Sequence, residues 1–303
     1  MGGLRWTRRT TRNIAKELRG LGIQVSPNTV ARLLSKMKFS LRTNRKKIES
    51  GFRVKPGHRE RRNKQFLNIA KQRQQFEKAG RPIISCDCKK KELVGLFKNP
   101  GRTWRCKPRD VLDHDFRSDA VGIAVPYGIY DLQRNTGMVV VGSSRETPEF
   151  AVDSVARWWR THGSQCYSRT DRLLILCDSG GGNSARSTVW KRDLQTKLAN
   201  RYGLTITVCH YPPGASKWNP IEHSLFSAIT NNWQGVPLTN YETVLKRIRT
   251  TKTDRGLKVI ATLNSKEYEK GGTVDADEMQ CLSCKPHKLL PQWNYTISPQ
   301  LNG

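Results

Sequence analysis

The feature that most constrains the fold is the continuous apolar run Leu173–Cys177, which ends at Asp178. A strand made of such a run turns neither face toward water, and strands of this kind belong to sheets covered by helices on both faces. The short run Ile83–Cys88 likewise carries an acid, Asp87, near its end. Both runs therefore predict sheet strands that place a carboxylate at the carboxyl edge, where α/β sheets form their sites.

The surrounding sequence alternates between strand and helix patterns. Further strands are expected at Lys91–Phe97, in a hairpin of Gly128–Asp131 with Met138–Gly142, and at Leu204–Cys209. Helices are expected from Pro148 to Gly163 behind a Thr147 cap, from Ala185 to Tyr202, and from Asn219 and Pro220 onward. This order predicts a mixed α/β sheet with helices on both faces.

The charge is large and unevenly distributed. The chain has 303 residues and a formal net charge of +29, and residues 1–82 hold 23 Lys or Arg against four Asp or Glu. A basic segment attached to a more balanced one favours a nucleic-acid partner. No apolar run approaches the ~20 residues needed to cross a bilayer, so no membrane partner is expected. Eight Cys at irregular spacings favour a reducing cytoplasm, and a bacterial, nucleoid-associated protein is expected.

Within the basic segment, two short helices are expected on either side of a turn. Ile14, Ala15, Leu18 and Leu21 share one face of the first helix, and Ser26 with Pro27 begins the second. The pattern resembles a small all-α helix-turn-helix domain. Its second helix would present Asn28, Thr29, Arg32 and Lys36 to the major groove, and Arg5, Arg8 and Arg9 would contact phosphates.

These patterns divide the chain into three parts. Residues 1–50 are predicted to form the helix-turn-helix region, and residues 51–82 a basic helical connector. Residues 83–303 are predicted to form the α/β domain with a C-terminal extension.

Three acids are candidates for the chemistry: Asp87, Asp178 and Glu222. Carboxylates brought together repel one another unless a cation lies between them, and oxygen ligands suit Mg²⁺ or Mn²⁺. Two such ions would support phosphodiester chemistry. Each acid also has a structural alternative: Asp87 as a turn residue, Asp178 in an Asx-turn, and Glu222 in a capping box with Asn219. Nearby, Lys89, Lys90 and Lys217 are expected to meet phosphates, and Trp218 is either a stacking platform or a core anchor.

Longer motifs around these acids resemble the ISAzo-type insertion-sequence transposases of the mariner-like group of DDE enzymes. The matching segments are Ile84–Gly95, Phe97–Asn99, Gly101–Arg102, Pro126–Asp131, Asp178–Asn183, His210–His223, Lys285–His287 and Trp293–Ile297. The resemblance implies a ribonuclease H-like core with Asp87, Asp178 and Glu222 as the metal-binding triad. It also implies cleavage at the ends of the element, followed by transfer of the freed 3′-hydroxyl into target DNA. The expected partner is double-stranded DNA, as terminal repeats and as target, with a homo-oligomer assembling on it.

Other interpretations of the sequence stay open. The helix-turn-helix and the charge alone would suit a non-catalytic DNA-binding regulator or an inactive transposase remnant, and the core alone would suit a ribonuclease H-like nuclease. Family members generally carry more sequence before the helix-turn-helix, so a copy shortened at its N-terminus is one interpretation. The lone pair Cys281 and Cys284 lacks the four ligands of a zinc site.

Overall fold

The computed structural model describes residue 7, residues 9–42 and residues 57–300. The chain divides into two compact units, Met1–Pro56 and Gly57–Gly303. Arg5 and Arg8 lie outside the described residues. No helix within the described ranges is long and apolar enough to cross a membrane.

The first unit contains two helices, α1 (Thr11–Gly20) and α2 (Pro27–Lys36). The predicted cap of the second helix is confirmed, because the Ser26 hydroxyl accepts a hydrogen bond from the Thr29 N–H at 3.1 Å. The predicted apolar faces are only partly buried. Ala15 and Val30 are buried, whereas Leu21, Leu33 and Met37 are exposed. Two helices of this length bury only the residues where they meet.

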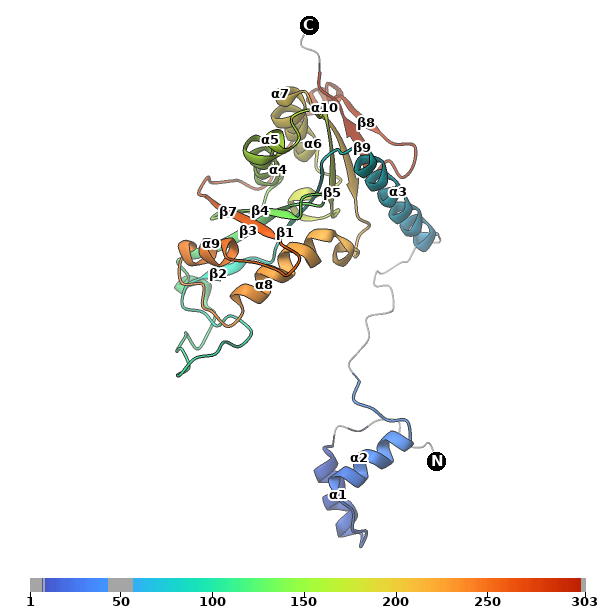
Figure 1. The fold of residues 1–303 in the computed structure, drawn as a ribbon, viewed down its shortest axis with the longest axis vertical. Helices are drawn as coiled ribbons and strands as arrows, with labels where there is room; N and C mark the ends of the chain where they lie inside the picture. The colour runs from blue at the N-terminus through green and yellow to red at the C-terminus, as the bar shows by residue number, and fades with distance from the viewer. Residues whose placement is uncertain (1–6, 8, 43–56, 301–303) are drawn as a thin grey trace. The chain divides into compact units, whose positions relative to one another are not determined.

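The second unit is built on one mixed sheet (Figure 1). Across the sheet the described strands follow the order β7-β4-β3-β1-β5-β6-β9-β8, and β2 pairs with β3. The first group of strands is β1 (Ile83–Cys88), β2 (Glu92–Val94), β3 (Gly122–Asp131) and β4 (Thr136–Gly142). The second group is β5 (Arg172–Cys177), β6 (Thr205–His210), β7 (Lys258–Asn264), β8 (Cys284–Pro286) and β9 (Asn294–Ile297).

Strand direction decides which strand ends share an edge. β1 runs parallel to β5, and β5 parallel to β6. β3 is antiparallel to both β1 and β4, so β4 runs in the same direction as β1. β7 is parallel to β4. The carboxyl ends of β1, β4, β5, β6 and β7 therefore lie along one edge of the sheet.

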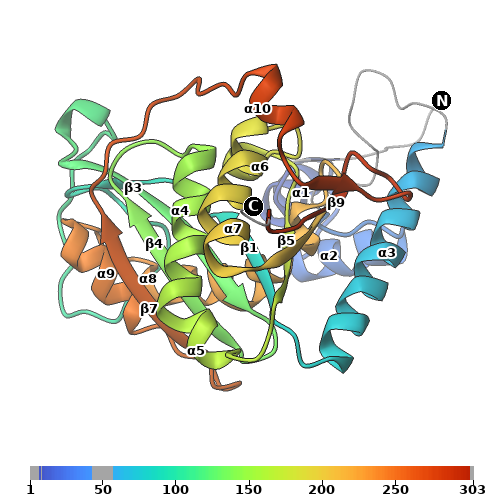
Figure 2. The ribbon, with the colours of Figure 1, turned by 90° about the horizontal axis from the view of Figure 1, so that it is seen from above.

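Helices cover both faces of the sheet, which confirms the predicted fold class (Figure 2). On one face α4 (Pro148–Trp158) and α6 (Thr188–Leu194) pack over the strands, followed by the short α5 (Ser164–Cys166) and α7 (Asn200–Tyr202). On the other face lie α8 (Ser227–Trp233) and α9 (Tyr241–Arg249). The short helix α10 (Ala276–Gln280) precedes β8.

Helix α3 (His58–Lys78) differs from its predicted role as a connector. Its apolar residues Ile69 and Phe76 are buried in a cluster with Ile83, Leu174 and Leu176 of β1 and β5. The helix covers the part of the sheet that α8 and α9 leave open, so it belongs to the second unit. Its mostly polar sequence concealed this, because the two buried apolar side chains are a small part of a long basic helix.

Other differences concern the sheet edges. The second predicted strand, Lys91–Phe97, is shortened to Glu92–Val94. Strands β7 and β9 were not among the predicted elements, and both add to the sheet from the C-terminal part of the chain. In β7 only Ala261 is buried, and the polar residues Lys258, Thr262 and Asn264 leave it an apolar run of just three residues.

Gly128 allows the helical segment that carries Glu222 to approach the sheet closely. It pairs with Asp87 across β3 and β1, and a Cβ atom at this position would lie 2.5 Å from the Phe226 ring and 2.8 Å from Ile221. A glycine inside a strand often marks such a close approach.

We therefore expect Gly128→Ala to lower the free energy of unfolding by about 1–3 kcal/mol, because the added methyl group overpacks this contact. The matched control is Gly180→Ala, since Gly180 has extended backbone and no atom within 4 Å of an added Cβ. Urea titration followed by circular dichroism measures both variants. Equal stabilities would show that the contact at Gly128 relaxes without cost.

Candidate active site

Three elements bring the three predicted acids to one region of the carboxyl edge. Asp87 lies at the end of β1, and its neighbours Cys86 and Cys88 face the core, as the strand alternation predicts. Asp178 directly follows β5. Glu222 is the first residue of the π-helical turn Glu222–Phe226, which leads into α8.

Two asparagine side chains hold these elements together at the carbonyl of Cys86. Asn183 follows the glycine-rich loop after Asp178, and its Nδ2 donates to the Cys86 oxygen at 3.4 Å. Asn219 precedes Glu222, and its Nδ2 donates to the same oxygen at 3.3 Å. The residue before Asp87 is therefore bonded to the segments that carry both other acids.

Further hydrogen bonds fix the two asparagines. The Tyr127 hydroxyl donates to Asn183 Oδ1 at 2.6 Å, and the Ser85 hydroxyl donates to Asn219 Oδ1. Ser85 Oγ also accepts a hydrogen bond from the Ile221 N–H at 3.1 Å, so a strand residue caps the helical segment. The alternative interpretation of Asn219 as a side-chain cap for its own helix is thus not realised, because its side chain turns toward β1.

The three acids are electrostatically coupled. Burial raises the pKa of Asp87 well above its ordinary range, and the charges of Asp178 and Glu222 raise it further. Burial also raises the pKa values of Asp178 and Glu222. In Glu222, the Asp178 charge adds to the rise and the Lys89 ammonium opposes it. Carboxyl groups in such a field hold protons unless positive charge is supplied.

Glu146 is a fourth acid at this site, and the sequence analysis missed it. It lies after β4, and its charge raises the pKa values of Asp87 and Asp178. One carboxylate oxygen accepts a hydrogen bond from the Gly182 N–H at 3.1 Å, and the other lies 3.1 Å from Lys91 Nζ. If β4 had been predicted to run parallel to β1, an acid that follows β4 would have been expected at this site. The carboxyl ends of both strands lie at the same edge of the sheet.

Across the described parts of the chain, no three His, Cys, Asp or Glu side chains lie close enough to hold a metal ion between them. The donor chemistry nevertheless fits a hard divalent cation, since the three coupled groups offer carboxylate oxygens. A bound cation would also reverse the unfavourable repulsion that raises their pKa values.

The predicted basic residues around the acids have different surroundings. Lys89, Lys90, Lys217 and Glu222 line one hollow of about 490 Å³. Lys89 is nearly covered, and its Nζ lies 4.5 Å from the centre of the Trp233 ring. Burial lowers the Lys89 pKa. Trp218 is 56% exposed and packs edge-on against Phe66, so it is not a buried core anchor.

A second hollow, of about 560 Å³, lies beside Asp178 and includes Arg186 and Trp293. Asp178 therefore borders one open hollow and Glu222 borders the other.

The first unit carries the other predicted contacts. Asn28, Arg32 and Lys36 are exposed on α2, whereas Thr29 is half-buried with its hydroxyl 2.9 Å from that of Ser26. The Arg9 side chain pairs with Glu17.

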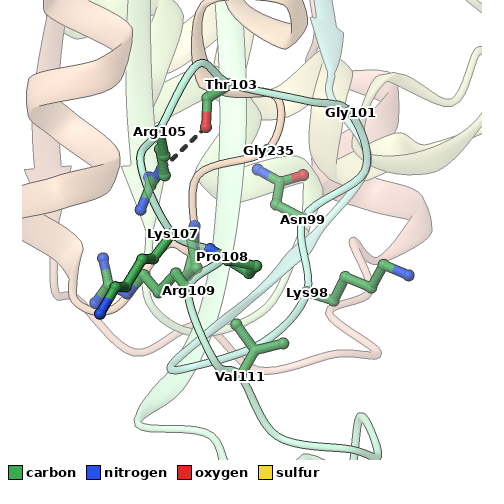
Figure 3. Close-up of a pocket in the computed structure, with 11 residues that line it drawn as sticks. Lys98, Asn99, Gly101, Thr103, Arg105, Lys107, Pro108, Arg109, Val111 and Gly235 are labelled. Carbon is green, nitrogen blue, oxygen red and sulfur yellow. Dashed lines mark hydrogen bonds between the residues drawn. The ribbon is translucent and has the colours of Figure 1, made fainter.

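A basic loop between β2 and β3 forms another positive surface (Figure 3). Arg105, Lys107 and Arg109 lie on one side of the view in Figure 3 and Lys98 on the other, around a hollow of about 550 Å³. The base of the loop is anchored, because Asn99 Nδ2 donates to the carbonyls of Trp233 and Val236 at 3.0 and 3.1 Å.

The sheet order, with an antiparallel β1-β3-β4 group continued by parallel β5 and β6, defines a ribonuclease H-like α/β domain. The family described as Rhodopirellula transposase DDE domain matches residues 1–299. The chain belongs to this family of DDE transposase domains.

Solved structures similar to this chain are complexes of Mos1 transposase. One is a Mos1 transposase paired-end complex with left transposon end, at 14% identity and a TM-score of 0.46. Another is the Mos1 mariner paired end complex with Mn, at 15% identity and a TM-score of 0.45. Each similarity covers 78% of this chain and 65% of the Mos1 chain, so this chain spans less than two thirds of those chains. No curated protein matches the chain.

The raised pKa of Asp87 predicts a pH-dependent cost in stability. The folded state releases this proton at higher pH than the unfolded state does, so stability falls as pH rises from the unfolded pKa near ~4 toward the folded pKa. In EDTA we expect Asp87→Asn to be more stable than the unchanged chain by about 1–3 kcal/mol at pH 8, and nearly equal to it at pH 4.

Thermal and urea unfolding across this pH range measure the difference. Asp171→Asn is the control, because Asp171 is exposed just before β5, at the opposite end of that strand. A constant difference between the Asp87 variant and the unchanged chain at all pH values would contradict the electrostatic origin.

Proposed function

We propose that this chain is an insertion-sequence transposase that cleaves DNA at the ends of its element and joins the freed 3′-hydroxyl to target DNA. The observation that carries the proposal is the convergence of Asp87, Asp178 and Glu222 at one sheet edge, with their pKa values raised together. Family membership supports the same reaction class.

We propose that Asp87, Asp178 and Glu222 would hold divalent cations, Mg²⁺ or Mn²⁺, in a two-ion site. Such ions activate the attacking oxygen and stabilise the leaving oxygen in phosphodiester chemistry. The chain itself supplies the carboxylates, the asparagines that hold their segments together, and Lys89 beside Glu222. The Glu146–Lys91 pair sits beside Asp87 and Asp178.

DNA would be bound by the positive surfaces around this site and by the first unit. Phosphate contacts are proposed for Lys90, Lys217, Arg186 and the basic loop, all of which border the hollows described above. Exposed Trp218 would stack on a base. In the first unit, α2 would enter the major groove with Asn28, Arg32 and Lys36, and Arg9 would lie near the backbone. Assembly of several copies on element ends is also expected.

Asp178→Asn should abolish Mg²⁺-dependent nicking of DNA that carries the element ends, because the amide removes a ligand charge while keeping the side-chain shape. DNA binding should be retained within about threefold, since phosphate contacts supply most of the affinity. Gel assays of nicking and of binding on the same DNA measure both effects. Asp171→Asn, at the other end of β5, is the matched control and should nick normally.

Nicking by the Asp178 variant at the rate of the unchanged chain would exclude the proposed triad. Tight binding without nicking by the unchanged chain, in Mg²⁺ and in Mn²⁺, would favour a non-catalytic DNA-binding protein instead.

The double variant Arg32→Ala with Lys36→Ala should bind element-end DNA about 10–100-fold more weakly. The preference for element-end DNA over unrelated DNA should fall as well, because both side chains are proposed to read base edges in the major groove. Lys252→Ala with Lys258→Ala is the control, because it removes the same charge from exposed residues near β7. Equal losses in both double variants would mean that net charge, not α2, determines binding.

A further inference from the structure

A buried chain of hydrogen bonds lies behind Asp178. His210 ends β6 and pairs in register with Cys177 of β5, and its ring is fully buried. His210 Nδ1 lies 2.9 Å from the backbone carbonyl oxygen of Asp178, and Nε2 lies 3.0 Å from the Tyr295 hydroxyl. The Trp190 indole Nε1 donates to the same hydroxyl oxygen at 2.8 Å.

The groups at the two ends of these hydrogen bonds fix where the imidazole proton lies, and Cys177 Sγ, 3.4 Å from Nδ1, is a weak acceptor beside it. An indole N–H only donates and a carbonyl oxygen only accepts. Tyr295 therefore accepts from Trp190 and directs its own proton to His210 Nε2, which leaves Nδ1 to carry the imidazole proton toward Asp178. The ring is fully buried, and its two nitrogens face an uncharged carbonyl and an uncharged hydroxyl, an environment that favours the neutral imidazole.

We propose that His210 is a positioning residue that holds the backbone of Asp178 through an Nδ1–H tautomer imposed by Trp190 and Tyr295. The proposal rests on the proposed function only in treating Asp178 as a catalytic acid. His210 itself does not reach the reacting groups, because its ring is fully buried and both ring nitrogens are already engaged.

Asp178 depends on such support because the segment after it is held loosely. The Asp178 carboxylate receives a long hydrogen bond from the Gly180 N–H at 3.4 Å, and an exposed loop follows. The next polar contacts along the chain are the Gly182 N–H on Glu146 and then Asn183 on the Cys86 carbonyl. The His210 bond thus fixes the start of the loop, and Asn183 fixes its end.

These hydrogen bonds also give the C-terminal strand β9 a role at the site. Tyr295 lies on β9, which pairs with β6, and Trp190 lies on α6 on one face of the sheet. Both side chains are buried, and the indole and phenol are joined directly. A strand more than a hundred residues after Asp178 in sequence therefore contributes to its position.

The tautomer is measured directly by ¹⁵N NMR of the histidine side chains in the full chain at pH 7. His210→Asn removes one signal set and so assigns it among the six histidines. We expect His210 to show a protonated Nδ1 and an unprotonated Nε2. In Tyr295→Phe, which removes the donor to Nε2, this pattern should change to a mixture of tautomers. A protonated Nε2 in the unchanged chain, or no change in Tyr295→Phe, would overturn the proposal.

Two substitutions of His210 test the positioning role, because they place a hydrogen-bond donor at different positions. The amide nitrogen of His210→Asn takes the place of Nδ1, whereas that of His210→Gln extends toward the place of Nε2. We expect His210→Gln to require about 10–100-fold more Mn²⁺ for half-maximal nicking, as supporting residues of metal sites do, and His210→Asn to stay within about threefold of the unchanged chain.

Melting temperatures and DNA binding, measured in parallel, separate this effect from unfolding. Should His210→Gln fail to fold, Tyr295→Phe takes its place, with an expected metal requirement between those of the two histidine variants. An equal metal requirement in His210→Asn and His210→Gln would overturn the positioning role. Nicking by the Asp178→Asn variant would instead contradict the proposed function. The result of the tautomer measurement does not depend on that function.

Discussion

The arrangement of the acids depends on one backbone carbonyl, that of Cys86. A carbonyl oxygen has two lone pairs, and here each is directed to an asparagine amide from a different segment. Strand pairing already aligns β1 with β5, but nothing in the sheet itself places the segment of Glu222. Asn219 does so, together with the Ser85 cap and the space left by Gly128. Removing both donors would leave a buried carbonyl without these partners, which is more costly than losing an ordinary hydrogen bond.

The acids of the site destabilise the folded state, and neighbouring uncharged groups hold their segments in place. Burial and mutual repulsion raise the pKa values of Asp87, Asp178 and Glu222, so their ionised forms disfavour the folded state. Uncharged groups compensate for this: the two asparagines at the Cys86 carbonyl, and the hydrogen bonds that run from Trp190 through Tyr295 and His210 to the Asp178 carbonyl. Neutral donors hold the backbone without cancelling the negative field that a cation requires, whereas additional lysines would weaken that field.

The sequence predicted those elements whose local signals agree with their tertiary environment. The apolar run Leu173–Cys177 is a central strand, and the Thr147 cap begins α4, because burial and capping act over a few neighbouring residues. Predictions failed where the burial came from distant partners. Helix α3 looks like a polar connector but covers part of the sheet, and strand β7, in which only Ala261 is buried, has an apolar run of just three residues. Glu146 was missed for a related reason, since its place at the site follows from the direction of β4, which depends on the pairing of β1 with β3 as well as on the hairpin.

The sequence by itself determined the class of fold, the family resemblance and the identity of three acids, because strand periodicity, helix caps and long motifs are local properties of the chain. Only the tertiary structure decided what surrounds those acids. Asn219 reads as a helix cap in sequence and becomes a bridge to β1, and His210 reads as the end of a strand and becomes the support of Asp178. Hydrogen bonds between residues more than 80 positions apart, such as that of His210 with Tyr295, depend on which strands lie side by side. Local sequence patterns do not encode that order.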